Sequence, residues 1–115
     1  MDSAERRIQD RNDAFCAVEL SSSAKPQRCG VTRNASERGL LIITPSRFEE
    51  GDDIEVAVHL RQESARRRGR VVRVTVNAIA SNELWRYRMA VELEEPLPSH
   101  MLEGAVQAAR ERQSA

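Results

Sequence analysis

The 115-residue sequence is poor in aromatic side chains, which make up only 3% of its residues. A folded core must therefore be built mainly from valine, leucine, isoleucine and alanine, and the chain length suits one domain. Long apolar runs are also missing. No stretch approaches the roughly 20 apolar residues that span a bilayer, and the first ten residues lack the apolar segment of a signal peptide. We therefore expect a cytoplasmic protein without membrane insertion.

The sequence also lacks the residue patterns of metal sites and of common active sites. Cys16 and Cys29 are the only cysteines and are not spaced as a CxxC pair, which argues against a disulfide scaffold or a structural zinc site. His59 and His100 are isolated, and no HExxH, GxSxG, Walker or GxGxxG motif is present. The acidic turn at residues 49–53 does not have the spacing of an EF-hand loop. We predict no catalytic residues, no metal and no cofactor.

Charge is balanced, but the basic side chains are almost all of one type. Eighteen acidic residues offset eighteen basic ones, so the strong positive field of a general nucleic-acid binder is absent. Lys25 is the only lysine, which leaves seventeen arginines, the side chain that suits planar contacts with phosphates and guanine edges. Four arginines form a cluster, at Arg66, Arg67, Arg68 and Arg70. A single-strand nucleic-acid binder combines such a cluster with exposed aromatic rings. Because Trp85 and Tyr87 are predicted to face the core, we interpret the cluster as a solvated hairpin loop.

Alternation of apolar and polar residues with a period of two predicts six strands. They cover residues 14–20, 28–33, 39–44, 54–61, 70–78 and 85–93. The run at 39–44 is apolar throughout, which is typical of a strand covered on both faces. The last two strands are predicted to form a hairpin with a turn at residues 80–83, and Val72, Val74 and Val76 are predicted to face the core.

A helix is predicted after Pro98, because Ser99 can cap it and an apolar stripe with helical spacing follows. The stripe consists of Met101, Leu102, Ala105, Val106 and Ala109. Strands and helices do not alternate along the chain, which argues against a βαβ fold. The predicted fold class is therefore all-β, an antiparallel barrel or sandwich whose terminal helix covers an opening or an edge.

Two short motifs together predict an anionic binding pocket. Residues 1–13 are dense in charge and add little to a core, so we interpret them as an arm, which carries Arg7 and Arg11 four residues apart. Downstream, the sequence supplies Asn34, Ser36 and Gly39. Alone, such an arginine pair is typical of a charged helix face, and such a run is typical of a turn. Together, guanidinium groups bind guanine edges and phosphates, an amide and a hydroxyl add hydrogen bonds, and glycine permits close backbone approach. A guanine-containing dianion fits this chemistry.

These residues resemble the PilZ family, whose cyclic di-GMP receptors carry RxxxR followed downstream by D/N-x-S-x-x-G. The matching segments are residues 7–11 and 34–39, and the strands and closing helix that follow are also family-like. The resemblance implies a six-stranded antiparallel β-barrel with a C-terminal α-helix. It divides the chain into an arm at 1–13, a barrel at 14–98 and a helix at 99–115. The sequence departs from the family pattern at Ala90, where the family frequently has glycine, and this affects how that strand fits the ligand.

By this resemblance, cyclic di-GMP binds on the outer surface of the barrel. The implied contacts are Arg7 and Arg11 on the arm, Asn34, Ser36 and Gly39 on the barrel, and Arg6 and Arg38 as auxiliary residues. The resemblance implies a receptor or adaptor rather than an enzyme, with an unidentified effector protein as partner, no specific nucleic acid, and a monomer or a dimer. Two other interpretations stay open: a PilZ-like module that binds a protein without nucleotide, and a small β-barrel that binds single-stranded nucleic acid through the arginine cluster.

Overall fold

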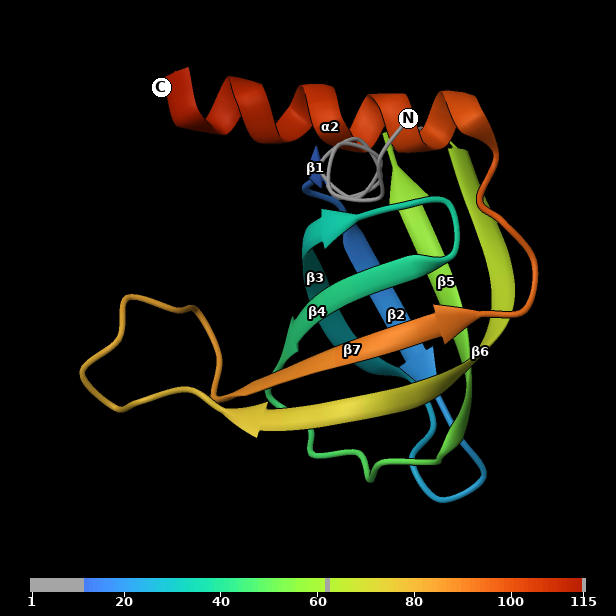
Figure 1. The fold of residues 1–115 in the computed structure, drawn as a ribbon, viewed down its shortest axis with the longest axis vertical. Coiled ribbons are helices and arrows are strands. Elements are labelled where there is room, and N and C mark those ends of the chain that lie inside the picture. Colours follow the sequence, from blue (N-terminus) through green and yellow to red (C-terminus); the bar gives the residue numbers. More distant parts are fainter. Residues whose placement is uncertain (1–11, 62, 115) are drawn as a thin grey trace, which may run out of the picture.

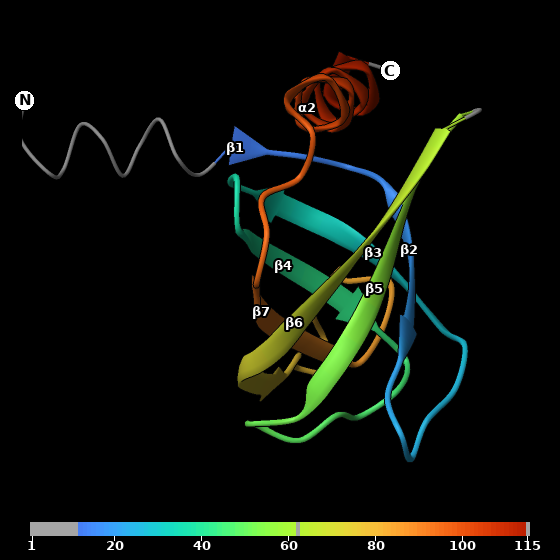
Figure 2. The ribbon, with the colours of Figure 1, turned by 90° about the vertical axis from the view of Figure 1, so that its right-hand side faces the viewer.

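The computed structural model describes residues 12–61 and 63–114, and its strands close into a barrel with a helix across one end (Figure 1, Figure 2). The elements are β1 (Asn12–Asp13), β2 (Ala17–Ser21), β3 (Arg28–Ala35), β4 (Gly39–Thr44), β5 (Asp53–Leu60), β6 (Glu63–Val76), β7 (Tyr87–Leu93) and α2 (Ser99–Ser114). Strands β2 to β7 are antiparallel and follow the order β3-β2-β5-β6-β7-β4, and the ring closes because β4 also pairs with β3. The short β1 pairs with the last two residues of β3. The predicted six-stranded antiparallel β-barrel with a C-terminal helix is confirmed.

Alternate residues of the barrel strands point inward and form an aliphatic core, as the composition predicts. The largest fully buried side chains include Leu20, Ile42, Val56 and Met89. Of the four aromatic residues, all of which the structure describes, only Phe48 is fully buried. Because burial of one such aliphatic side chain contributes about 1.5–3 kcal/mol, many moderate contributions hold the barrel together in place of a few large rings.

The arginine cluster lies in a strand and not in the hairpin loop that was predicted for it. Strand β6 pairs with β5 along residues 63–70, which include the whole cluster. Arg66 and Arg70 form ion pairs with Glu55 (2.8 Å) and Asp53 (3.8 Å) of β5. These pairs between neighbouring strands partly neutralise the cluster. The loop prediction was wrong because a continuous run of charge hides the period of two in the sequence.

Two β-bulges interrupt the alternation, one in β3 and one in β6. In β3 the register with β4 shifts just before Asn34, so Arg33 is the extra residue and Asn34 joins the outer face. In β6 the register with β7 shifts between Val71 and Arg73, so Val72 is the extra residue. Val71 is fully buried whereas Val72 is 48% exposed, and the prediction that Val72 faces the core is therefore wrong.

Strands β6 and β7 form the predicted hairpin, but their connection is longer than the predicted turn. It spans residues 77–86 and projects beyond the barrel wall (Figure 1). Strand β7 begins at Tyr87 rather than Trp85, and both rings are half-buried instead of lying in the core. Val76 at the end of β6 is also exposed, and in the loop Ile79 and Leu84 are 89% and 59% exposed. These apolar side chains lie beyond the part of the barrel that encloses the core.

Helix α2 covers one end of the barrel and packs against the segment between β1 and β2. Its buried face contains Met101, Ala105 and Ala109 of the predicted stripe. The backbone N–H of Phe15 donates to the Ala105 carbonyl at 2.8 Å, and the Arg112 guanidinium lies 4.1 Å from the centre of the Phe15 ring. Within residues 12–61 and 63–114, no helix has both the length and the apolar character needed to cross a bilayer.

Candidate functional site

The connection between β3 and β4 positions three of the predicted site residues, Asn34, Ser36 and Gly39. The Gly39 N–H donates to the Ser36 hydroxyl oxygen at 3.0 Å, and the Ser36 N–H donates to the Gly39 carbonyl at 2.8 Å. A Cβ atom on Gly39 would lie only 3.0 Å from the Ser36 hydroxyl oxygen, which explains why glycine suits this position. The Ser36 hydroxyl supports the turn as an acceptor, so its proton remains available to a ligand.

A surface cavity of about 620 Å³, called the groove below, extends from this turn across the outer faces of β4, β7 and β6. Its volume lies within the range of small-molecule sites, roughly 300–1,000 Å³. Its lining includes the turn residues Asn34, Ser36, Arg38 and Gly39, the β6 residues Val72, Arg73 and Thr75, and the β7 residues Arg88, Ala90 and Glu92. The structure thus brings all of the predicted barrel residues of the site together along one surface.

The strand register explains which side chains meet in the groove. Ala90 pairs with Leu41 of β4 on one side and with Arg73 of β6 on the other. Two residues earlier in β7, Arg88 pairs with Thr75 of β6. Residues two apart in a strand share a face, so Ala90 and Arg88 both line the groove. Ala90, where the sequence departs from the family pattern, is half-buried in the lining.

Arg73 and Arg88 are groove residues that sequence analysis did not assign to the site. The alternation of apolar and polar residues in β6 and β7 places both side chains on the face opposite the core. This was the only sequence signal for their position. Their proximity to Asn34 depends on strand register, and neither motif spacing nor alternation reports register. Among the described residues, the Arg73 side chain has no ion-pair or hydrogen-bond partner. Its guanidinium is therefore available to an anion in the groove.

The charge of the groove is positive. Three arginines, Arg38, Arg73 and Arg88, line it together with one glutamate, Glu92. Several donors on planar guanidinium groups suit the oxygens of a phosphate. Within residues 12–61 and 63–114, no cluster of His, Cys, Asp and Glu side chains is arranged to hold a metal ion. The arrangement is therefore suited to binding a small anionic ligand.

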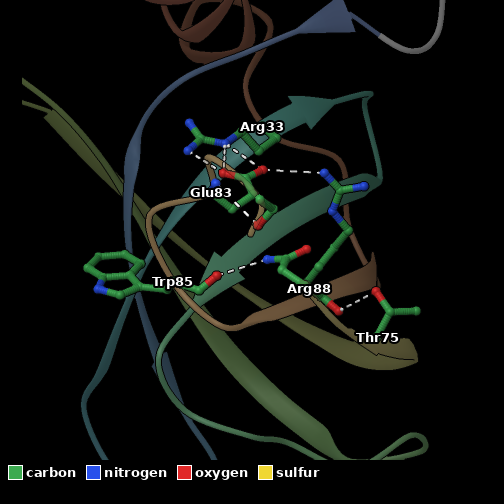
Figure 3. A network of polar contacts seen from close by, with 7 residues as sticks. Arg33, Thr75, Glu83, Trp85 and Arg88 are labelled. Carbon is green, nitrogen blue, oxygen red and sulfur yellow. Dashed lines mark hydrogen bonds and ion pairs between the residues drawn. The ribbon is translucent and has the colours of Figure 1, made fainter. Parts of the chain in front are cut away.

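A partly buried ion-pair network adjoins the groove at the loop between β6 and β7. Figure 3 shows Glu83 of this loop between Arg33 and Arg88. Its carboxylate oxygens lie 2.7 Å from Arg33 Nη2 and 3.3 Å from Arg88 Nη2. The hydrogen bonds from Arg33 lower the pKa of the Glu83 carboxyl, so it is ionised at neutral pH. Among the described residues, the buried Nε of Arg88 has no hydrogen-bond partner.

The remaining predicted site residues, Arg6, Arg7 and Arg11, lie outside the described residues. The two residues that follow pair with the end of β3, where Asn34 lines the groove. Asn12 pairs with Ala35 and Asp13 pairs with Asn34. The Asp13 carboxylate also accepts a hydrogen bond from Gln113 of α2 at 3.1 Å. The first described residues therefore lie between the end of the helix and the β3 residues that border the groove.

Hydrogen bonds from β3 also fix the segment between β1 and β2. The Thr32 hydroxyl donates to the Ala14 carbonyl at 2.8 Å and accepts from the Cys16 N–H at 3.0 Å. Cys16 is buried, and burial raises the pKa of its thiol, whereas Cys29 is exposed on β3. Neither cysteine lines the groove. Cys16 therefore serves the packing of the barrel.

Solved structures of three proteins are similar to this fold. The PilZ domain of YcgR from Escherichia coli, solved with c-di-GMP, has a TM-score of 0.65 at 10% sequence identity, with 90% of each chain covered. The inhibitor of motility MotI/DgrA from Bacillus subtilis has a TM-score of 0.60 at 16% identity, with 90% of this chain covered. The PilZ domain of CeSA from a cellulose-synthesizing bacterium has a TM-score of 0.53 at 16% identity, with 90% of this chain and 97% of that chain covered.

The extent of these similarities differs between the chains. This chain spans about half of MotI/DgrA, 49% of which is covered. A search of curated protein sequences found no match. The family model of the PilZ domain matches residues 5–107, from before the first described strand into the terminal helix. Since this match covers most of the sequence and the fold agrees with it, the chain belongs to the PilZ domain family.

Proposed function

We propose that this protein is a cyclic di-GMP receptor that acts as an adaptor in bacterial second-messenger signalling. The observation that carries the proposal is the groove, in which Asn34, Ser36 and Gly39 share one surface with strand arginines. Cyclic di-GMP presents phosphates and guanine bases, and arginine and amide groups bind both kinds of group. The similar PilZ domain of YcgR was solved with c-di-GMP, which supports the same ligand here.

In this proposal the barrel supplies one wall of the site. The Asn34 amide exchanges hydrogen bonds with a guanine edge or a ribose, and the Ser36 hydroxyl donates to a phosphate oxygen. Gly39 leaves room for the ligand to approach the backbone. Arg38 is an auxiliary contact. One of its donors, Nη1, is used by the Glu94 carbonyl at 3.1 Å, and its other donors are available to the ligand.

We assign the other wall to Arg7 and Arg11, with Arg6 as an auxiliary contact. The path of the neighbouring chain supports this assignment, since Asn12 pairs with Ala35 at the border of the groove. Hydrogen bonds to charged groups contribute about 1.5–3 kcal/mol each. Loss of one arginine of the pair is therefore expected to weaken binding by at least about tenfold.

The proposed output is binding rather than catalysis. A receptor of this kind signals when a second molecule distinguishes its ligand-bound surface from its free surface. We propose that this second molecule is an effector protein. Its identity is a separate question from ligand binding, which can be measured without the partner.

Calorimetric titration with cyclic di-GMP tests the proposed function, with GTP and cyclic di-AMP as competing ligands. We expect saturable binding that is selective for guanine and is lost in Arg7→Ala and in Asn34→Ala. Arg28→Ala is the matched control, because Arg28 is an exposed arginine of β3 that does not line the groove. The titration also gives the number of ligand molecules per chain.

Absence of heat at any concentration of cyclic di-GMP, in a protein that melts cooperatively, would refute the receptor proposal. That result would favour the second candidate, a PilZ module that binds a protein without nucleotide. The exposed Ile79 and Leu84 on the projecting loop are the observation that favours this candidate. Binding that survives in Arg7→Ala and Asn34→Ala would place the nucleotide elsewhere on the barrel.

A further inference from the structure

Glu83 is an anion held beside the groove by two arginines (Figure 3). Its Oε1 accepts from Arg33 Nη2 at 2.7 Å and from Arg33 Nε at 2.9 Å, and its Oε2 accepts from Arg88 Nη2 at 3.3 Å. Its side chain is only 17% exposed. Two cations thus surround one anion, and this partly enclosed group has an excess of one positive charge.

The two arginines differ in how fully Glu83 satisfies their donors. Arg33 makes three contacts of 2.7 to 3.2 Å and does not line the groove. Arg88 lines the groove, makes one contact with Glu83 at 3.3 Å, and has a buried Nε without a partner among the described residues. A buried donor without an acceptor is unfavourable. Arg88 therefore has unused donor capacity, and of the two arginines it is the one that lines the groove.

We propose that Arg88 is an additional ligand-binding residue, and that Glu83 competes internally with a ligand phosphate for it. This inference rests on the proposed function, since it requires an anionic ligand in the groove. When the ligand binds, Arg88 directs its donors to a phosphate oxygen, while Arg33 retains the Glu83 carboxylate. Without ligand, Glu83 neutralises part of the positive charge at Arg88. The affinity of the groove for cyclic di-GMP is therefore lower than its arginines alone would give.

The first test measures the affinity of Arg88 variants for cyclic di-GMP. Arg88→Gln is expected to weaken binding by about tenfold to a hundredfold, the effect of losing a hydrogen bond to a charged group. Arg88→Lys retains the charge but not the planar donors, so an intermediate affinity is expected. Arg86→Gln is the matched control, because Arg86 is exposed, lies two residues away and does not line the groove. Its affinity is expected to stay within about twofold of wild type.

The second test uses Glu83→Gln, which removes the charge but keeps an acceptor oxygen toward both arginines. We expect this variant to bind cyclic di-GMP about three- to tenfold more tightly, since the competing charge is gone. Its ligand-free form is expected to melt at a lower temperature than wild type, because the ion pairs are lost. A purely structural role for Glu83 would weaken binding and stability together, so opposite changes separate the two roles. In the Arg88→Gln background, the gain from Glu83→Gln is expected to be much smaller.

Several outcomes would overturn the inference while leaving the proposed function intact. If wild type binds and Arg88→Gln binds equally well, Arg88 is not a ligand contact. If Glu83→Gln weakens binding, or tightens it equally in the Arg88→Gln background, Glu83 does not compete for Arg88. Absence of binding in wild type as well would instead refute the proposed function, and with it this inference.

Discussion

Replacement of Gly69 by alanine is a direct test of how closely β6 and β7 approach beside the groove. A Cβ atom on Gly69 would lie 2.8 Å from the Glu92 carbonyl oxygen, 3.0 Å from Val91 Cγ1 and 3.2 Å from Leu93 Cδ2. The carbonyl belongs to the backbone of β7 and cannot rotate away, so one of the two strands must shift. Overpacking of this kind costs about 1–3 kcal/mol. Alanine recovers about 0.5–1 kcal/mol through its lower backbone entropy in the unfolded chain.

A contact below 3.0 Å with a backbone oxygen places the cost in the upper part of this range, about 2–3 kcal/mol. After the gain from alanine, we expect Gly69→Ala to lower the free energy of unfolding by about 1–2.5 kcal/mol, which corresponds to a Tm lower by about 5–15 °C. Urea denaturation measures this loss, and the slope with denaturant should stay unchanged. Gly104→Ala is the control, because its new Cβ would meet only the end of the Leu60 side chain, at 3.2 Å. In the helix this substitution is expected to stabilise by up to about 1 kcal/mol. A Gly69→Ala protein as stable as wild type would refute the reasoning from strand spacing.

Three further predictions follow from the described contacts. Cys29 should react with a thiol reagent in the native protein while Cys16 stays protected, because Cys16 is buried and the pKa of its thiol is raised. Mass spectrometry counts the modified thiols, and two per folded chain would contradict the burial of Cys16. Because Arg33 lowers the pKa of Glu83, the stability that the ion pairs contribute is fully present above the ordinary carboxyl pKa of about 4.3 and is lost as pH falls through the lowered value. Urea denaturation should therefore give a stability difference between wild type and Glu83→Gln that is constant from about pH 5 to 7 and shrinks below about pH 4. A difference that stays constant down to about pH 2 would count against the ion pairs. Asn34→Ala should lose most affinity for cyclic di-GMP but little stability, because no hydrogen bond within the described residues depends on the Asn34 side chain; a large drop in Tm would show a structural role instead.

The architecture could be predicted from the sequence because one face of most strands is buried. In β5, for example, Ile54, Val56 and Val58 recur with a period of two and all three are buried, whereas Glu55 and His59 on the opposite face are exposed. The prediction was wrong where this contrast is weak. In the first half of β6 the outward residues are arginines that pair with β5, and sequence analysis interpreted their charge as a loop. Ion pairs between strands are not visible in a linear pattern.

The site could be predicted only in part, for a related physical reason. The residues Asn34, Ser36 and Gly39 are close in sequence, so their short turn was accessible to motif analysis. Arg73 and Arg88 join them through strand pairing that depends on the two bulges. Each bulge adds one residue and thereby turns the next side chain, Asn34 or Arg73, to the outer face. The roles of Arg7 and Arg11 stay predictions, because these residues lie outside the described part of the chain.

The position of Asp13 has a practical consequence for following ligand binding. Its backbone pairs with Asn34 at the border of the groove, and its carboxylate accepts a hydrogen bond from Gln113 in the last turn of α2. One residue thus connects the proposed nucleotide site to a helix end that does not line the groove. An environment-sensitive fluorophore attached to this last turn would therefore leave the groove unobstructed. Only Asp13 would separate the fluorophore from Asn34 at the border of the groove. If the proposed receptor function holds, a label at this position would report binding of unmodified nucleotide.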